Sequence, residues 1–528
     1  MIKLAQRQRV IGVVFLAWIV TSLACNLPMR TGNPANLRVE DLRQTLDAQY
    51  LAATQGTIST PTPGLPPDTS LFIGLQTATP PNPLQATLLP PDIGTPGPYI
   101  VYPAQSGDTL AALAKRFGVR AEEIKSPQAI ESQGLIPPGQ LLEIPNVLSK
   151  TASPAALLPD SEVINSPSAA DFNLHAFISL SSGYLSGYSE SVDGENLTGV
   201  EIVERVANQA SVNPMLLLAL LEYQSGWVLG QPRHPDSLAY PLRMHVSGRR
   251  GLYQELATAA TQLNLGYYGW RQGILTDLKF ANGTVQRISP GLNAGSVALQ
   301  HLFALLQAPE EWSNTLYGED GIIATHQRMF GDPWSRAAQV EPLLPAGLVQ
   351  PDFVLPFPAG ERWSLTGGPH FSWNTSSPRG ALDFAPVTGE PACTISRAWV
   401  TAPASGVVVR SNYNVLALDL DGDGREQTGW VLVFLHLADK DRQPVGARLE
   451  MDDPLGHPSC EGGRATGTHV HIARKYNGEW LGADWPLPFV LSGWQAVAGP
   501  KNYGGELVKG EQVVSANPGG PRSSVIIR

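Results

Sequence analysis

Cysteine is scarce in this chain of 528 residues, which contains only Cys25, Cys393 and Cys460. No two of them form a C-x-x-C pair, which argues against thiolate zinc sites and redox dithiols. Charged residues are also few, at 16%, against roughly 25% in average soluble domains. The net charge of -10 leaves no basic surplus to neutralise phosphates, so the sequence indicates no nucleic-acid partner.

The N-terminus has the pattern of a secretory signal peptide over residues 1–25. Basic residues precede the apolar run Val10 to Val20, and Ser22-Leu23-Ala24-Cys25 follows. We expect a lipoprotein signal with lipid on the sulfur of Cys25, which would tether the protein to the outer face of a membrane. Ser22 stands where such signals usually carry Leu, so simple secretion and an uncleaved anchor stay open. In an exported protein the remaining pair, Cys393 and Cys460, is predicted to form a disulfide.

The length predicts about three or four domains. Residues 26–98 are rich in Pro and Thr, as in Thr60-Pro61-Thr62-Pro63, and are predicted to be an extended tether without a core.

Residues 99–146 have the pattern of a small α+β unit. A strand at Tyr99 to Tyr102 is followed by a turn, a helix from Leu110 to Phe117, a second helix at Ala121 to Lys125 and a strand at Leu141 to Pro145. The Gly-Asp-Thr-Leu turn and the Pro-Gly-Gln-Leu-Leu-Glu-Ile-Pro ending resemble a LysM domain. LysM domains bind glycans that contain N-acetylglucosamine, such as peptidoglycan. The resemblance implies a glycan groove formed by eight residues: Gly107, Asp108, Thr109, Leu110, Ile136, Pro137, Pro138 and Gly139.

A linker is predicted at 147–170 and a mostly helical domain at 171–345. Expected helices cover residues 199–210, 213–224, 252–263, 293–306 and 318–329. The helix that ends Gln224-Ser225-Gly226-Trp227 resembles the start of lysozyme and lytic-transglycosylase domains, where the position of Gln224 holds a Glu that acts as general acid. An amide cannot donate that proton, and Glu222, two residues earlier, points about 200° away around the helix. A degenerate scaffold and an active glycosidase that uses Glu222 or another acid both stay open.

Residues 346–510 are predicted to be all-β, with a tail at 511–528. Strand-like runs at 406–410, 415–420, 430–437 and 469–474 are separated by turns rich in Gly, Asp and Asn. Within the last run, His469 and His471 are two residues apart, so a strand directs both toward one face. Imidazole is a preferred zinc ligand, and a metal site is therefore a hypothesis for this face.

The order of His370, Asp383, His436 and the H-x-H resembles the lysostaphin-type (LytM-like) zinc metallopeptidases, and their staphylolytic branch in particular. That resemblance implies the duplicated hybrid motif fold and one Zn²⁺ per chain held by His370, Asp383 and His471. It also implies that His436 and His469 are catalytic and that His457 is structural. One departure is Arg379, which stands where many members of the family have their first ligand; His370 then takes that place, as in the staphylolytic branch. The implied activity is cleavage of peptide bonds in peptidoglycan.

Two alternatives to that activity stay open: a non-catalytic wall anchor, and an activator of a separate hydrolase. A further hypothesis concerns Asp419, Asp421 and Asp423, whose spacing before Gly424 is that of a Ca²⁺ loop. Asp-Gly is equally typical of a plain hairpin turn.

Overall fold

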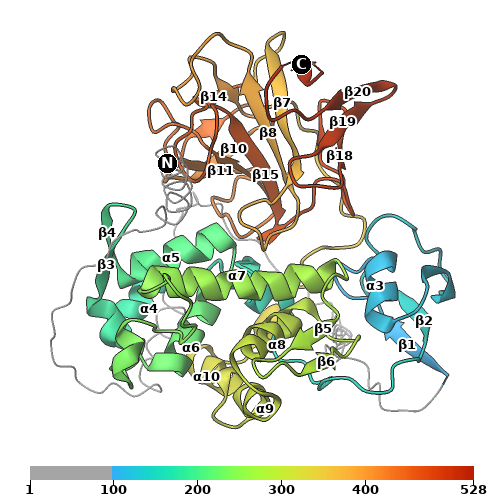
Figure 1. Cartoon of the computed structure of the whole chain (residues 1–528), viewed down its shortest axis with the longest axis vertical. Coiled ribbons are helices and arrows are strands. Elements are labelled where there is room, and N and C mark those ends of the chain that lie inside the picture. Colours follow the sequence, from blue (N-terminus) through green and yellow to red (C-terminus); the bar gives the residue numbers. More distant parts are fainter. Residues whose placement is uncertain (1–97, 522) are drawn as a thin grey trace, which may run out of the picture.

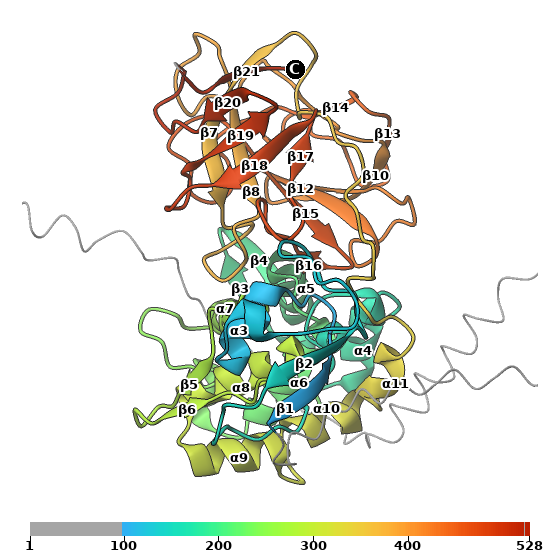
Figure 2. The same cartoon turned by 90° about the vertical axis from the view of Figure 1, so that its right-hand side faces the viewer.

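The computed structural model describes residues 98–521 and 523–528. The predicted signal peptide, Cys25 and the tether up to residue 97 lie outside the described residues. Figure 1 shows a β-rich part above a layer of helices, with the small unit around α3 beside that layer; Figure 2 gives the same arrangement from the side. In the described part of the chain, no helix has the length and apolar character required to cross a membrane.

The small unit agrees closely with the sequence prediction. It consists of β1 (Tyr99–Pro103), α3 (Leu110–Phe117) and β2 (Leu141–Pro145), with β1 and β2 antiparallel. Thr109 caps α3 by accepting a hydrogen bond from the Ala112 N–H, and Gly118 ends it in the left-handed conformation. The second expected helix was wrong, because Ala121–Glu123 is only one 3-10 turn.

The helical domain is built around a single large apolar core. Two hairpins, β3 (Ser189–Val192) with β4 (Glu195–Thr198) and β5 (Asp277–Lys279) with β6 (Val285–Arg287), accompany the helices. The helices are α4 (Leu174–Ser181), α5 (Gly199–Ala210), α6 (Pro214–Ser225), α7 (Leu252–Arg271), α8 (Ala294–Leu306), α9 (Pro309–Tyr317), α10 (Ile322–Phe330) and α11 (Pro333–Ala337). The helix predictions need correction in three respects. α7 runs eight residues past its expected end at Leu263, and the helix expected from Gly318 begins at Ile322. In addition, α4, α9 and α11 were not expected.

The segment predicted as a linker, 147–170, is part of this domain from Ala152 onward, since Ala152 is buried in the helical core and its N–H donates to the Arg287 carbonyl. Leu157, Leu158, Val163 and Ile164 are buried in the helical core. The prediction followed the Ser, Pro and Ala content of the segment and overlooked these apolar side chains. Their burial in the core stabilises the packed segment, whereas a free linker buries no apolar surface.

The C-terminal domain is all-β, as predicted. Its main sheet has the order β13-β10-β11-β12-β15-β8-β7-β21, with β16 paired to β15. These strands are β7 (Arg362–His370), β8 (Ala381–Pro386), β10 (Gly406–Asn412), β11 (Val415–Asp419), β12 (Trp430–Leu435), β13 (Arg448–Leu449), β15 (Val470–Tyr476), β16 (Glu479–Trp480) and β21 (Val525–Ile527). Smaller sheets pair β9 (Val400–Thr401) with β14 (Pro454–Gly456), and join β17 (Val490–Leu491), β18 (Trp494–Ala498), β19 (Gly505–Lys509) and β20 (Gln512–Ser515).

The predicted tail at 511–528 is instead integrated into this domain. β20 pairs with β19, and β21 adds to the edge of the main sheet beside β7. The run Val525-Ile526-Ile527 supplies the apolar side chain, Ile526, that this edge buries.

The two faces of the main sheet belong to different cores. Along β11, Val415 and Ala417 join the core of the helical domain, whereas Leu416 and Leu418 face the inner core of the β domain. This follows from the alternation of side chains along a strand. The sheet is therefore packed on both sides, and the helical domain covers one of them.

A buried ion cluster joins the two domains. Arg271 at the end of α7 lies 2.9 Å from a carboxylate oxygen of Asp160 and 3.0 Å from one of Glu479 in β16. Tyr267 donates a hydrogen bond to the same Glu479. All four side chains are buried. Because water does not solvate these charges, each charge is stabilised by its ion-pair partner at the domain interface.

Candidate metal centre

Three adjacent strands position the predicted ligands. His370 is the last residue of β7, Asp383 lies in the middle of β8, and His471 is the second residue of β15. Asp383 and His471 are directly opposite each other in the β8–β15 ladder. The β7–β8 register shifts between Gly367 and His370, a bulge-like irregularity that accompanies the placement of His370 beside the other two.

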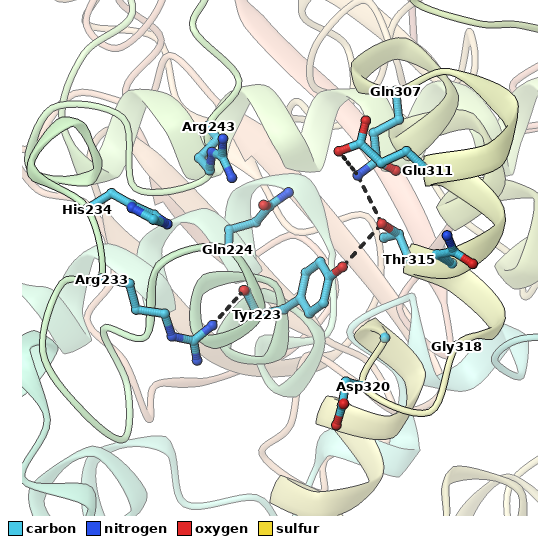
Figure 3. Close-up of a pocket in the computed structure, with 12 residues that line it drawn as sticks. Tyr223, Gln224, Arg233, His234, Arg243, Gln307, Glu311, Thr315, Gly318 and Asp320 are labelled. Carbon is cyan, nitrogen blue, oxygen red and sulfur yellow. Dashed lines mark hydrogen bonds between the residues drawn. The ribbon is translucent and has the colours of Figure 1, made fainter.

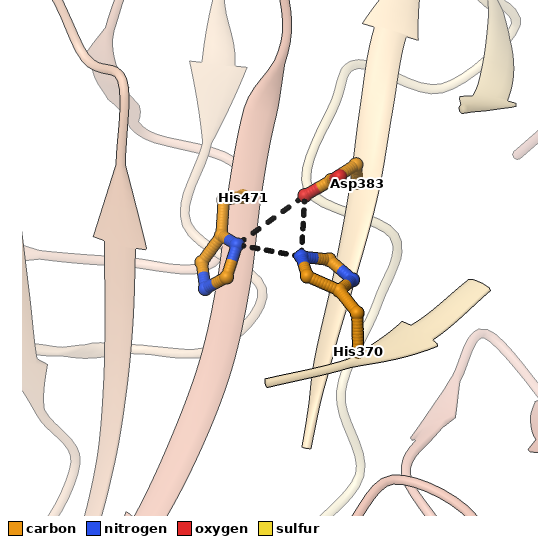
Figure 4. Close-up of side chains that lie close together, drawn as sticks. All are labelled: His370, Asp383 and His471. Atoms are coloured by element: carbon orange, nitrogen blue, oxygen red, sulfur yellow. Dashed lines mark hydrogen bonds and ion pairs between the residues drawn. The ribbon is translucent and has the colours of Figure 1, made fainter. Parts of the chain in front are cut away.

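The ligand atoms of these residues converge on one point (Figure 4). All lie within 4.8 Å of one another, and all three residues are buried. Nε2 of His370 and Nδ1 of His471 lie 3.2 and 3.3 Å from Oδ1 of Asp383. That oxygen is buried and receives no hydrogen bond within the described residues.

The hydrogen bonds of the two outer ring nitrogens determine the tautomers of His370 and His471. Nδ1 of His370 lies 2.9 Å from the Gly368 carbonyl, and Nε2 of His471 lies 2.9 Å from the Ser372 carbonyl. A carbonyl only accepts hydrogen bonds, so each outer nitrogen carries a proton, and in the neutral ring the inner nitrogen presents a lone pair. Two lone pairs and a carboxylate oxygen then face one another, a donor set that fits a divalent cation such as Zn²⁺.

The electrostatics of the cluster agree with an anionic site. Burial raises the pKa of Asp383, but the neighbouring His370 and His471 outweigh it and hold that pKa far below its usual range. Burial lowers the pKa of His370, yet Asp383 brings it above its ordinary value. The pKa of His471 is lowered, chiefly by burial. Asp383 is therefore a carboxylate at neutral pH.

The other two predicted histidines border the same cluster. Nε2 of His469 lies 3.9 Å from Oδ1 of Asp383, and the rings of His469 and His436 are 4.5 Å apart. His436 follows β12 directly and has a positive φ of 63°, which turns its side chain out of the strand pattern. Burial, together with His469 and His471, lowers the pKa of His436 to about 4.

Both of these rings are oriented by the backbone. Nδ1 of His469 donates to the Gly467 carbonyl at 2.7 Å, and Nδ1 of His436 donates to the Glu461 carbonyl at 3.0 Å. In the neutral form of each ring, Nε2 is therefore the nitrogen without a proton.

Three further residues shape the site, and of these the sequence analysis had singled out only Arg379. The ring of Tyr503 stacks on His370 at 4.2 Å. A Cβ on Gly367 would lie 2.5 Å from Oδ2 of Asp383, so only glycine fits there. Arg379 donates to the carbonyls of Pro369 and Gly499; it braces the loop beside His370 in place of binding metal. None of these has a sequence signal apart from proximity to the predicted ligands.

A disulfide links Cys393 and Cys460, with their Cα atoms 4.9 Å apart. Cys460 directly precedes Glu461, whose carbonyl orients His436, so the bridge restrains the loop that sets this ring. His457 lies outside the cluster, with its ring 3.9 Å from that of Trp399 and Nδ1 bonded to the Ala398 carbonyl. These contacts fit the structural role expected for it.

The acidic hairpin brings Asp419, Asp421 and Asp423 together, with oxygens within 4.8 Å of one another. Both oxygens of Asp419 already accept backbone N–H groups, from Asp421, Gly422 and Gly424. These bonds account for the turn without an ion and favour the plain hairpin over the Ca²⁺ loop.

The residues expected to bind glycan are only partly accessible. Asp108 and Thr109 are buried, and Asp108 is bonded to Tyr102 and Arg116. Gly107 lies under the guanidinium of Arg271. Ile136 is also buried, whereas Leu110, Pro137, Pro138 and Gly139 keep exposed surface. In this arrangement the accessible part of the expected groove is the 137–139 side.

In the helical domain, Glu222 and Gln224 have different environments. The Glu222 carboxylate is buried and accepts hydrogen bonds from the Val228 and Leu229 N–H groups and from Arg233. Gln224 lines a pocket of about 540 Å³ (Figure 3). Glu222 is therefore committed to the fold of the 226–233 loop and is unavailable as a general acid.

Comparison with known proteins matches two segments to families: residues 102–145 to the LysM domain, and residues 156–343 to the N-terminal domain of LasA. Protease LasA of Pseudomonas aeruginosa is 28% identical over 361 residues, which cover 63% of this chain and 78% of LasA. Beta-lytic metalloendopeptidase of Lysobacter enzymogenes is 27% identical over 167 residues, which cover 30% of this chain and 84% of that relative.

Among solved structures, the M23 metalloprotease pseudoalterin matches 32% of this chain and 96% of its own, with 22% identity and a TM-score of 0.27. The match to the LasA N-terminal domain includes most of the segment that was predicted as a linker. The chain is thus similar to the LasA-like staphylolytic metallopeptidases over most of its described length, and its residues 102–145 match the LysM domain.

Proposed function

We propose that this protein is a zinc-dependent endopeptidase that hydrolyses peptide crosslinks of bacterial peptidoglycan. The observation that carries the proposal is the inward-facing set of two imidazole lone pairs and the unpartnered buried oxygen of Asp383. Relatives named as a protease and as metalloendopeptidases, together with the LysM match, support the wall as substrate.

One Zn²⁺ per chain would be held by His370, Asp383 and His471. Bound there, zinc would act as a Lewis acid on the scissile carbonyl and lower the pKa of water to about 7. The protein supplies the rigidity: the ligands come from neighbouring strands, and carbonyl groups of Gly368 and Ser372 hold the two rings in place.

His469 and His436 would move the protons. Each presents an unprotonated Nε2 near the cluster, so each is suited to accept a proton from the attacking water. His469 is the preferred base because its Nε2 lies close to Asp383. His436, held neutral by its low pKa, would steer the water or, once protonated, stabilise the developing oxyanion. The two roles can be exchanged without changing the rest of the mechanism.

The cellular setting follows from the same proposal. A wall hydrolase acts outside the cytoplasm, and lipid on Cys25 would keep the protein at the membrane surface while the predicted tether would let it reach the wall. The LysM domain would hold peptidoglycan through the exposed side of its groove, around residues 137–139.

The test is hydrolysis of a crosslinked wall peptide by the purified chain, with bound zinc measured on the same preparation. The proposal expects about one zinc per chain and cleavage that stops after chelation and returns with zinc. Zinc-free protein that holds wall material without cutting it would instead support the anchor alternative.

A further inference from the structure

The pocket in the helical domain lies apart from the metal cluster and takes no part in the proposed peptidase chemistry. Its volume of about 540 Å³ falls in the range of roughly 300–1,000 Å³ typical of small-molecule sites. It opens between the C-terminal end of α6, the loop that follows it, and helix α9.

The walls of this pocket are fixed by hydrogen bonds. Tyr223 donates to Thr315 on α9 at 3.1 Å, and Gln307 donates to the same hydroxyl oxygen at 2.9 Å. Arg233 is held by the Glu222 carboxylate at 3.0 Å and by the Tyr223 carbonyl at 3.1 Å. The cavity is therefore organised before anything enters it, which lowers the cost of binding.

Other polar groups on the same walls are free. The side chains of Gln224, His234 and Arg243 make no hydrogen bond or ion pair with the described residues. Oε1 of Gln307 is buried and without a donor in the described part of the chain. An acceptor in this state favours a ligand that brings an N–H or O–H group.

The charges are separated across the pocket. Figure 3 shows Arg233, His234 and Arg243 toward one side and Glu311 and Asp320 toward the other, with Gln224 between them. A carboxylate suits the arginine side, and an ammonium group suits the acidic side. An uncharged sugar would use neither.

We propose that this pocket binds, without cleaving, a short zwitterionic peptide that has a free carboxylate and a free amine, such as an uncrosslinked stem peptide of the wall. The choice of wall peptide rests on the proposed function. Binding at this pocket would hold the enzyme beside crosslinks while the metal centre cuts elsewhere. Glu222 takes no part in this binding, because its carboxylate accepts hydrogen bonds from the Val228 and Leu229 N–H groups of the following loop.

The test is titration calorimetry on the full chain after removal of metal, so that binding is measured without cleavage. The probes are a stem tetrapeptide, the same peptide with its carboxylates amidated, the same peptide with its amine acetylated, and a peptide-free glycan oligomer. We expect the unmodified peptide to bind and either modification to weaken binding about tenfold or more. Equal binding of the glycan oligomer, or none by the peptide, would overturn the proposal.

Matched variants locate the site. Arg243→Ala removes an exposed guanidinium and Glu311→Gln removes an exposed negative charge. Each should weaken peptide binding about tenfold. Arg249 and Glu310 are exposed residues nearby that do not line the pocket. The control variants Arg249→Ala and Glu310→Gln should therefore bind the peptide with the affinity of the wild type. Unchanged binding by both pocket variants would place the peptide elsewhere, and release of sugar reducing ends by the chain would contradict a site that only binds. Because the metal-free chain is used, this result is independent of whether the metal centre cuts peptides.

Discussion

Nε2 of His370 lies 3.0 Å from Nδ1 of His471 although the other nitrogen of each ring is bonded to a backbone carbonyl. Two neutral rings in these tautomers have no proton to share between them. A cation between the two lone pairs and Asp383 would remove the repulsion, and this relationship supports the proposed metal site over a chance cluster of buried histidines.

The first prediction concerns the ligands. His471→Ala, His370→Ala or Asp383→Ala should each lower bound zinc to near zero, and activity should fall with it because both the Lewis acid and the activated water are lost. Elemental analysis of the purified variants measures this directly. Exposed His175, in the helical domain, provides the control His175→Ala, which should keep its zinc. Full zinc in the Asp383 and His370 variants would show that the ligand set is wrong.

The second prediction separates ligands from proton-transfer groups. His469→Ala and His436→Ala should retain zinc yet lose about a hundredfold to ten-thousandfold in kcat, the usual cost of losing a general acid or base. Zinc content and the rate on a crosslinked peptide are measured on the same samples. An empty site in His469→Ala with a filled one in His471→Ala would reverse their roles, and a near-normal rate in His436→Ala would leave one catalytic histidine.

The third prediction addresses the domain interface. Arg271→Met leaves Asp160 and Glu479 buried without their cation, which should cost about 3–5 kcal/mol. The urea midpoint of unfolding, followed by tryptophan fluorescence, should shift down accordingly. Arg249→Met removes an exposed arginine on the same domain and should leave the midpoint in place. Equal midpoints for both variants would show that the ion cluster does not join the domains energetically.

The fourth prediction is a pH dependence of stability. Burial, with a smaller effect of Arg336, lowers the pKa of His326 to about 3. The unfolded chain takes up this proton below about pH 6.5 and the folded chain does not, so stability is lost as the pH falls from about 6.5 toward 3. His326→Phe cannot titrate and should lose less Tm than the wild type between about pH 7 and pH 5. The exposed-site variant His175→Gln should follow the wild type, and a wild-type slope in His326→Phe would refute the assignment.

Short-range patterns predicted most of the fold. α5 was predicted with its exact ends, and in the structure a capping box of Thr198 and Glu201 begins this amphipathic helix. Strand β15 was predicted from the apolar run around His471, and the alternation of side chains along a strand predicted that His469 and His471 face the same side. The order of domains followed from composition and from the two family resemblances.

What the sequence did not predict depends on contacts between distant segments. The burial of Leu157 and Leu158, the edge strand β21 and the ion cluster at Arg271 each need a partner far along the chain. In the site, the stacking of Tyr503 on His370 and the brace from Arg379 also join residues that no local pattern connects. Asp108 and Gly107 are a further example. The local sequence pattern predicted that they line a glycan groove, but contacts with distant residues bury them.

The most direct test of the account is mass analysis of the fragments that the purified, zinc-loaded chain releases from purified peptidoglycan, beside His471→Ala. The account predicts fragments with new amine and carboxylate ends from cut peptide crosslinks, intact glycan links, and no release by the variant. Fragments with new sugar ends, or equal release by His471→Ala, would contradict a peptidase centred on His370, Asp383 and His471.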